Sequence, residues 1–197
     1  MAIDKQYWNN RYKTHQTSWD MGNISDPLKN YFDQLKNKNI SILIPGCGNA
    51  HEAEYLIQND FSNITLIDIS ELVVDSLKKK FEQYISEGKM KILCGDFFEL
   101  DEQFDLIIEQ TFFCALDPSL RKKYAEKMNT LLGDNGKLSG VLFSFPLTTE
   151  GPPFGGNKEE YQNYFATLFQ IQTMEPCYNS IQPRQERELF FVLKKLQ

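Results

Sequence analysis

Apolar residues of this 197-residue chain gather in short runs that alternate with segments of helical periodicity. Five runs are typical of buried strands, at residues 41–45, 64–69, 89–94, 104–109 and 138–145. Between two of them Val73, Leu77 and Phe81 recur near helical spacing, and Ser70 precedes them as a predicted N-cap. Strand runs that alternate with helical runs predict an α/β fold, a mostly parallel sheet flanked by helices.

Turn and helix-start signals organise the rest of the chain. Asp26 before Pro27 predicts the start of a helix, and a helix from Pro118 to about Leu132 is expected to end at the turn cluster 133–136. A short helix over 161–169 and strands at about 169–175 and 186–194 follow, and antiparallel pairing is one option for these last strands. We therefore expect a seven-stranded sheet in a single domain spanning residues 1–197.

Two segments lie outside this alternation. Residues 1–25 contain a cluster of aromatic side chains, and residues 148–157 form a loop too long and too rich in glycine and proline for a tight connection. We interpret the first segment as an N-terminal lid and the second as a substrate-side loop.

The turn after the first predicted strand has the features of a cofactor site. Gly46 and Gly48 lack a Cβ, so the chain can turn sharply and a ligand can approach the backbone. Asp68 follows twenty residues after Gly48, where a carboxylate at the end of the second strand accepts hydrogen bonds from ribose hydroxyls. A dinucleotide-binding turn would need a small residue at position 51, which is His51, whereas Ala50 comes one position early. The spacing therefore favours S-adenosylmethionine over NAD.

Two further strand ends fall at the same edge of the predicted sheet. Asp96, after the third strand, can accept a hydrogen bond from an adenine amino group while Phe97 packs on the ring. Gln110, at the end of the fourth strand, can contact the cofactor, and Phe112 and Phe113 can line a small dry pocket. Strand-end turns followed by core phenylalanines are the alternative interpretation.

Aromatic residues near the N-terminus suggest a covering wall. Trp8 and Tyr12 are four residues apart and share one face of a helix, and Trp19 follows in a turn-like segment. Aromatic faces attract a sulfonium as they attract an ammonium group. The same rings packed into the core are the competing interpretation.

Charge and cysteine usage narrow the function classes. With 21 basic and 27 acidic residues, the net charge of -6 opposes docking on nucleic acid or anionic lipid. The four cysteines form no C-x-x-C pair and only two histidines are present, so no metal site is predicted. No apolar run approaches the ~20 residues of a membrane span, so we expect a cytoplasmic protein. Cys114 is interpreted as an inert buried thiol, and no catalytic acid or base is assigned.

Several motifs in register resemble the thiopurine S-methyltransferase family, which includes plant halide and thiol methyltransferases. They run in order from Tyr7 to Phe154: Tyr7-Trp8-Asn9-Asn10-Arg11-Tyr12, Trp19-Asp20-Met21-Gly22, Ile44-Pro45-Gly46-Cys47-Gly48-Asn49-Ala50-His51-Glu52, Asp68-Ile69-Ser70, Thr111-Phe112-Phe113-Cys114-Ala115 and Gly151-Pro152-Pro153-Phe154. The resemblance implies the Rossmann-like class I methyltransferase fold, with S-adenosylmethionine as cofactor and S-adenosylhomocysteine as product.

The resemblance also implies a set of site residues. Trp8, Tyr12 and Trp19 would line the cofactor from the lid, Gly46 would meet its methionine part, Asp68 the ribose, Asp96 and Phe97 the adenine, and Gln110 the sulfonium end, with Gly48 and Ile69 in the same site. Tyr12 occupies a position that is commonly Trp in the family. Gln110 stands where thiopurine-type members have Arg and plant halide-type members have Tyr, which leaves the acceptor open.

The expected activity is methyl transfer to a small soft nucleophile: a thiol, thiopurine, thiocyanate or halide. Phe113 and Phe154 are expected to contact the acceptor, with Phe154 closing over it. We expect a monomer that acts on a small molecule without nucleic acid or membrane. A non-catalytic S-adenosylmethionine-binding protein and a methyltransferase of proteins are alternatives, because binding residues alone do not demonstrate turnover. A short-chain dehydrogenase is disfavoured, because no tyrosine has a lysine four residues later.

Overall fold

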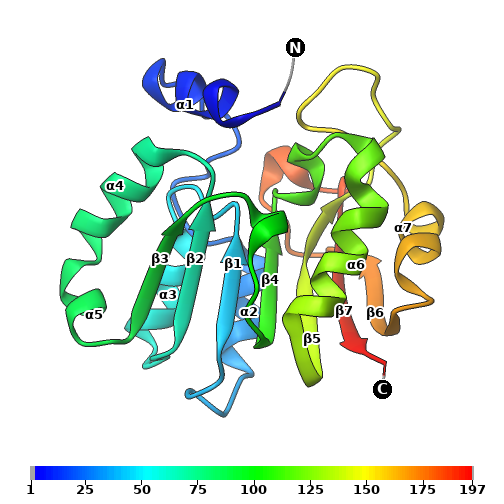
Figure 1. Cartoon of the computed structure of the whole chain (residues 1–197). Helices are drawn as coiled ribbons and strands as arrows, with labels where there is room; N and C mark the ends of the chain where they lie inside the picture. Colours follow the sequence, from blue (N-terminus) through cyan, green and yellow to red (C-terminus); the bar gives the residue numbers. More distant parts are fainter. Residues whose placement is uncertain (1–2, 197) are drawn as a thin grey trace.

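Helices and strands alternate through residues 3–196, which the computed structural model describes (Figure 1). In chain order the elements are α1 (Lys5–Lys13), α2 (Asp26–Asp33), β1 (Ile42–Pro45), α3 (His51–Gln58), β2 (Ile64–Asp68), α4 (Glu71–Lys80), α5 (Glu82–Ser86), β3 (Met90–Cys94), η1 (Phe97–Glu99), β4 (Phe104–Gln110), η2 (Phe113–Ala115), η3 (Pro118–Leu120), α6 (Arg121–Leu131), β5 (Leu132–Phe143), α7 (Lys158–Phe165), β6 (Phe169–Pro176), η4 (Gln182–Arg184) and β7 (Glu188–Lys195), where η marks a short 3-10 helix. The predicted alternation is confirmed.

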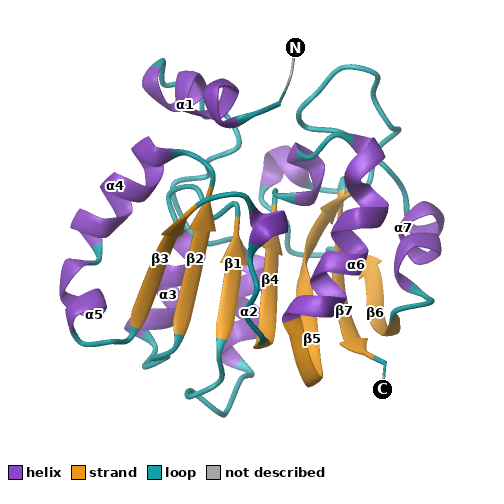
Figure 2. Ribbon diagram, viewed as in Figure 1, coloured by secondary structure: helices purple, strands orange, loops and turns teal. Residues whose placement is uncertain are grey.

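Within the described residues, seven strands form one sheet in the order β3-β2-β1-β4-β5-β7-β6 (Figure 2). The pairs among β1 to β5 are parallel, and Ile44 of β1 lies opposite Leu66 of β2. β7 is antiparallel to both of its neighbours, β5 and β6, so the sheet is mixed. The expectation of a mostly parallel sheet therefore holds for β1 to β5, and the last two strands take the antiparallel option.

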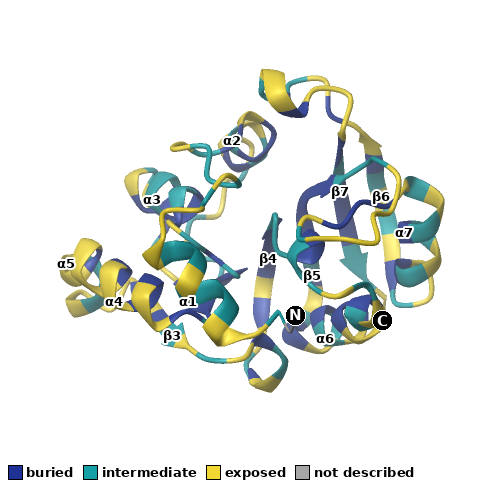
Figure 3. Ribbon diagram, turned by 90° about the horizontal axis from the view of Figure 1, so that it is seen from above, coloured by how far each residue is buried: buried dark blue, intermediate teal, exposed yellow. Residues whose placement is uncertain are grey.

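Two apolar clusters cover opposite faces of the sheet. Successive strand residues point to opposite faces, so Ile42 and Ile44 pack with α2, α3 and α4, while Leu43 packs with α6 and α7 on the other side. Viewed from above, the buried residues concentrate along the strands and the inward helix surfaces (Figure 3). Among residues 3–196, none of the helices has the length and apolar character that crossing a bilayer requires.

The expected turn after α6 is absent. β5 begins at Leu132, directly after the helix, and the cluster 133–136 is a bulge inside the strand. Phe104 of β4 pairs with Leu132, but Leu106 pairs with Lys137, so extra residues of β5 are looped out between these pairs. The glycine and asparagine residues of this cluster therefore form a bulge in β5 and not a turn between elements.

Two helix starts differ from those expected. α2 begins at Asp26 itself, after Ser25. α7 begins at Lys158, because the Asn157 side chain accepts a hydrogen bond of 2.9 Å from the N–H of Glu160 and so caps a helix three residues earlier than predicted. The Ser70 cap of α4 is confirmed, since its side chain accepts from the N–H of Val73.

Strand order places a switch point beside β1. The chain leads from β1 to β2 and β3 on one side and to β4 and β5 on the other, so the connections leave the carboxyl ends of β1 and β4 in opposite directions. Ligands of open α/β sheets bind in the crevice at such a point. α1 lies above this edge of the sheet in Figure 1.

Candidate active site

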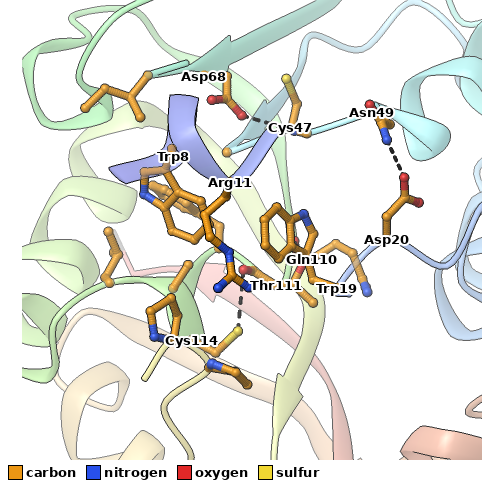
Figure 4. A pocket seen from close by; sticks show the side chains of 18 of the residues that line it. Trp8, Arg11, Trp19, Asp20, Cys47, Asn49, Asp68, Gln110, Thr111 and Cys114 are labelled. Atoms are coloured by element: carbon orange, nitrogen blue, oxygen red, sulfur yellow. Dashed lines mark hydrogen bonds between the residues drawn. The ribbon is translucent and has the colours of Figure 1, made fainter. Parts of the chain in front are cut away.

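A cavity of about 560 Å³ opens at the carboxyl edge of the sheet. Its lining comes from α1, from the segment after it, from the turns after β1 and β3, and from the ends of β2, β4 and β5. Pro152, Pro153, Pro183, Arg184 and Arg187 complete it. Figure 4 shows Trp8, Arg11 and Trp19 grouped together, with Asp68 toward one end of the view and Cys114 toward the other. The volume is within the range of small-molecule sites.

The turn after β1 presents bare backbone to this cavity. Gly46, Gly48 and Ala50 have φ angles of 55°, 50° and 56°, the left-handed region that favours glycine. A Cβ on Gly46 would lie 2.3 Å from Cδ2 of Phe112, and a Cβ on Gly48 would lie 3.1 Å from the Tyr12 hydroxyl. The turn is thus packed between two aromatic side chains, and the sharp turn expected from the glycines is confirmed.

Asp68 stands at the end of β2 and is 7% exposed. Its Oδ2 accepts a hydrogen bond of 3.1 Å from the N–H of Gly48, and its Oδ1 accepts one of 2.8 Å from the N–H of Ser70. Burial raises the pKa of Asp68, although these N–H donors oppose the shift. A carboxylate has about four acceptor positions, so Asp68 can also accept hydrogen bonds from hydroxyls in the cavity. Ile69, the next residue, lines the cavity beside it.

Asp96 and Phe97 lie at the cavity edge after β3. Asp96 Oδ1 accepts a hydrogen bond of 2.9 Å from the N–H of Phe98 and so caps η1. Phe97 packs edge-on against Phe112, with ring centroids 5.2 Å apart. Asp96 therefore forms the local turn, and both Asp96 and Phe97 also line the cavity, so the two interpretations of this strand end do not exclude each other.

The three N-terminal aromatic residues gather into one wall. Trp8 and Trp19 meet edge to face at 5.4 Å between ring centroids, and Tyr12 meets Trp19 at 5.6 Å. The Arg11 guanidinium lies 5.4 Å from the Trp19 ring, and burial raises the pKa of Tyr12. All four side chains line the cavity and none is fully buried, so they are not simple core residues.

Asp20 ties this wall to the glycine turn, a contact that the sequence did not indicate. Asn49 Nδ2 and the N–H of Gly22 donate to its carboxylate, and His51 Nε2 lies 2.7 Å from its Oδ1. Burial would raise the pKa of Asp20, but the donors from Gly22, Asn49 and His51 hold it below its ordinary value. Asn49 and His51 are about thirty residues away from Asp20 along the chain, so no local pattern reveals these two partners.

A second contact joins the wall to the C-terminal part of the chain. Arg184 Nη2 donates to the carbonyl oxygen of Trp19 at 2.7 Å, across 165 residues of sequence. Its Nη1 approaches the buried carboxylate of Glu188 at 3.4 Å, and its guanidinium lies 5.4 Å from the Phe143 ring. The last forty residues, which carry no recognisable motif, thus contribute to the site.

The other end of the cavity has apolar walls and a cationic rim. Ser25 Oγ donates to Gln110 Oε1 at 3.3 Å, and Cys114 Sγ donates to the carbonyl oxygen of Thr111 at 3.4 Å. Burial raises the pKa of the Cys114 thiol far above its ordinary value, in agreement with an inert thiol. Further lining residues at this end are Phe143, Phe145, Pro152, Pro153, Arg184 and Arg187.

Phe113 and Phe154, expected to contact the acceptor, are not among the lining residues. Phe113 is 1% exposed and packs edge-on against Tyr124 at 4.9 Å, because its side chain points into the core while Phe112 points to the cavity. Phe154 is buried and its N–H donates to the carbonyl oxygen of Cys114 at 2.8 Å. Phe112, Pro152 and Pro153 line the cavity in this region, and acceptor contact by Phe113 and Phe154 stays a prediction.

The donor set fits S-adenosylmethionine. The buried Asp68 carboxylate lines the cavity and has acceptor positions left that ribose hydroxyls would fit, the glycine turn lines the same cavity, and the aromatic wall offers ring faces that would attract a sulfonium. Asp96 and Phe97 offer an acceptor and an apolar ring for adenine. A pyrophosphate would instead require the third small residue that His51 replaces.

Sequence comparison identifies relatives along nearly the whole chain. A family model described as thiopurine S-methyltransferase (TPMT) matches residues 3–195. Probable thiol methyltransferase 2 of Arabidopsis thaliana is 30% identical over 163 residues, which cover 82% of this chain and 72% of that protein. Thiocyanate methyltransferase 1 of Brassica oleracea is 28% identical over 203 residues, covering 99% of this chain and 87% of that protein. Thiopurine S-methyltransferase of Nitrosospira multiformis is 23% identical over 190 residues, covering 87% and 86%.

Solved structures with the same fold include methyltransferases. The Burkholderia thailandensis 1,6-didemethyltoxoflavin-N1-methyltransferase, with bound S-adenosylhomocysteine, has a TM-score of 0.77 at 14% identity and covers 98% of this chain and 87% of its own. Magnesium protoporphyrin IX methyltransferase from Synechocystis PCC 6803, with bound S-adenosylmethionine, has a TM-score of 0.74 at 13% identity, with coverage of 98% and 95%. The fold is thus that of class I methyltransferases. Together with the family match, this means that the chain belongs to the thiopurine S-methyltransferase family and is an S-adenosylmethionine-dependent methyltransferase.

Proposed function

We propose that this enzyme methylates a small soft nucleophile: a thiol, thiopurine, thiocyanate or halide. The observation that carries the proposal is the acceptor end of the cavity, where apolar walls meet guanidinium groups directly beside the cofactor residues. Relatives named for thiol, thiocyanate and thiopurine methylation support the same class. When bound, S-adenosylmethionine supplies an electrophilic methyl group on a sulfonium, and S-adenosylhomocysteine is the product.

In this proposal the cofactor occupies the half of the cavity formed by β1, β2 and β3. Asp68 accepts hydrogen bonds from the ribose hydroxyls, Gly46 and Gly48 leave room for the methionine part, and Ile69 packs beside the ribose. Asp96 and Phe97 hold the adenine. Gln110 lies at the sulfonium end, and Ser25 fixes the orientation of its amide by donating to Oε1. These assignments are supported by the positions of the residues along one continuous cavity.

In the predicted lid segment 1–25, the described residues 3–25 act as a lid, and residues 148–157 act as a substrate-side loop of the same methyltransferase domain. Trp8, Tyr12 and Trp19 would cover the cofactor, and α1 is attached to the start of α4 because Asn9 shares a hydrogen bond of 2.7 Å with Ser70. The substrate-side loop is attached to α6, because Arg121 Nη2 donates a hydrogen bond of 2.7 Å to the carbonyl oxygen of Gly155. Its Pro152 and Pro153 form part of the acceptor wall.

The acceptor end favours an anionic nucleophile. Methyl transfer would break the S–CH3 bond of the sulfonium, form a bond from the methyl group to the anion and release the neutral thioether, so the transition state would be less polar than the reactants. Walls such as Phe143 and Phe145 would accelerate it by excluding water. Arg187 stacks 4.7 Å from the Phe145 ring and offers a positive charge at the cavity rim. Holding two reactants in line is worth up to ~7–11 kcal/mol. A nucleophile that arrives as an anion needs no general base.

We further propose a cytoplasmic monomer whose partner is a small molecule. The acidic balance of the chain supports action without nucleic acid, because phosphate backbones repel a net charge of -6. The cysteines Cys47, Cys94, Cys114 and Cys177 carry free thiols, as is usual in a reducing compartment.

A binding and turnover assay tests the proposal. The purified protein is titrated calorimetrically with S-adenosylmethionine and with NAD, then incubated with a thiopurine, a small thiol, thiocyanate and iodide while S-adenosylhomocysteine is measured. We expect binding of S-adenosylmethionine alone and product from at least one acceptor. Binding without product from any acceptor would contradict the proposal.

Asp68→Ala provides the first residue test. We expect it to weaken S-adenosylmethionine binding by about tenfold or more, because two charge-assisted hydrogen bonds to hydroxyls are lost. Asp75→Ala, which removes an exposed carboxylate of α4 outside the cavity, is the matched control and should bind normally. Equal affinities of the two variants would refute the ribose assignment.

A further inference from the structure

Glu109 is a fully buried carboxyl group directly beneath the cavity. It is the residue before Gln110 at the end of β4, and its side chain is 0% exposed. Gln110, Thr111 and Phe112 line the cavity, whereas Glu109 does not. Burial of a carboxyl group is costly unless it is hydrogen-bonded, so its partners indicate what it holds in place.

Its partners are two N–H groups of the turn that follows β4 and one hydroxyl of α6. Glu109 Oε1 accepts hydrogen bonds from the N–H groups of Phe112 at 2.7 Å and Phe113 at 2.9 Å, and Oε2 accepts one from the Tyr124 hydroxyl at 2.6 Å. The first N–H groups of a helix lack partners within it, and here a carboxylate satisfies those at the start of η2. Thr111 has a φ of 58°, which turns the chain back over the carboxylate.

The turn that Glu109 holds connects the two halves of the cavity. The Phe112 ring lies against Gly46, where even a Cβ would come within 2.3 Å of it, and edge-on to Phe97. The backbone of Glu109 packs closely on Gly140, its ladder partner in β5, because a Cβ at position 140 would lie 2.1 Å from the Glu109 carbonyl oxygen. β4 is thus connected to the glycine turn through two contacts: the Glu109 carboxylate binds the N–H of Phe112, and the Phe112 ring packs on Gly46.

We propose that Glu109 is a positioning residue for methyl transfer. It holds the Phe112 ring against Gly46 and thereby shapes the part of the cavity that binds the methionine end of the cofactor. The inference rests on the proposed cofactor site, and it adds a residue that touches neither cofactor nor acceptor. Without the carboxylate, the N–H groups of Phe112 and Phe113 lose their acceptor and the turn relaxes. The ring then leaves Gly46, and the cofactor loses a wall.

The test compares variants that keep or remove the acceptor for these N–H groups. Glu109→Gln retains an amide oxygen for both, and its amide nitrogen can donate to the Tyr124 oxygen. Glu109→Ala removes every partner. Ser139→Ala is the matched control, because Ser139 is equally buried on β5 and donates to Phe191 instead, at 3.0 Å. Each folded variant is titrated calorimetrically with S-adenosylhomocysteine, well below its melting temperature.

We expect Glu109→Ala to raise the dissociation constant of S-adenosylhomocysteine at least tenfold. For Glu109→Gln the constant should stay within about threefold of that of the unaltered chain, and for Ser139→Ala within about twofold. If Glu109→Ala does not fold, Glu109→Asp replaces it, because a carboxylate drawn back by one methylene cannot reach both N–H groups and must show the same loss. Native affinity in a folded Glu109→Ala or Glu109→Asp variant would overturn the proposal, and so would equal losses in Glu109→Ala and Ser139→Ala. Cofactor binding without product from any acceptor would contradict the proposed function and leave this comparison intact.

Discussion

At the scale of single residues, the site depends on buried charges whose surroundings set their ionisation. Burial raises the pKa of Glu109 to about 7, against hydrogen bonds from Tyr124, Phe113 and Phe112 that would lower it. Burial likewise raises the pKa of Asp68, whereas donors outweigh burial at Asp20. The pKa values of carboxyl groups in one site are therefore shifted in opposite directions.

The raised pKa of Glu109 predicts a stability change with pH. Between the unfolded value of ~4.3 and the native value of about 7, the folded protein holds a proton that the unfolded chain has released. The unfolding free energy contributed by this group therefore falls as pH rises through that window and is constant above it. Glu109→Gln removes the titration, so its melting temperature relative to the unaltered chain should increase from pH 5 to pH 8. Thermal unfolding at four pH values measures this, and a difference that stays constant with pH would contradict it.

Arg187 allows a prediction about acceptor charge. Arg187→Gln should raise the Michaelis constant for thiocyanate or iodide by about three- to tenfold, since a charge interaction at close approach in water is worth ~1 kcal/mol. The effect should shrink in high salt. Lys122→Gln removes a cation of α6 that is 83% exposed and outside the cavity, and it should leave the constant unchanged. The same Michaelis constant in both variants would exclude an anion-binding role for Arg187.

At the scale of elements, the N-terminal wall can be followed by fluorescence. Trp8 and Trp19 are the two tryptophans of the chain, so its indole emission reports on this segment. S-adenosylhomocysteine should change that emission, and Trp8→Ala and Trp19→Ala should each weaken its binding several-fold while the melting temperature holds. The reason is that both rings are only half-buried and face the cavity. Loss of folding with unchanged affinity of the folded fraction would show that the rings are core residues and no lid.

At the scale of the whole molecule, the cofactor would contact α1 and both halves of the sheet at the same time. Its cavity is lined by α1, by the β1–β3 half and by the β4–β7 half, so occupancy should stabilise all three together. A ligand at a hundred times its dissociation constant adds ~2.7 kcal/mol to the unfolding free energy. For a chain of this length that corresponds to roughly 5–10 °C in melting temperature. Scanning fluorimetry with S-adenosylhomocysteine tests this, with NAD as the control that should produce no shift.

Much of the fold and part of the site were predictable from local signals. Continuous apolar runs and stretches of helical periodicity marked the order of elements, because strands and helices bury apolar side chains at spacings that the local sequence already shows. The turn after β1 was predictable because Gly46 and Gly48 adopt backbone angles that other residues resist. Trp8, Tyr12 and Trp19 were predicted together and do meet in the structure.

What the amino-acid sequence determined by itself was therefore the α/β class, the glycine turn and the place of Asp68 at a strand end. Tertiary structure alone decided that β7 runs antiparallel, that Phe112 faces the cavity while Phe113 enters the core, and that the predicted turn at 133–136 is a bulge. It alone joined Arg184 to Trp19 and Asp20 to His51. The physical reason is that backbone conformation and burial periodicity are properties of neighbouring residues, whereas the partner of a polar group depends on how distant elements pack.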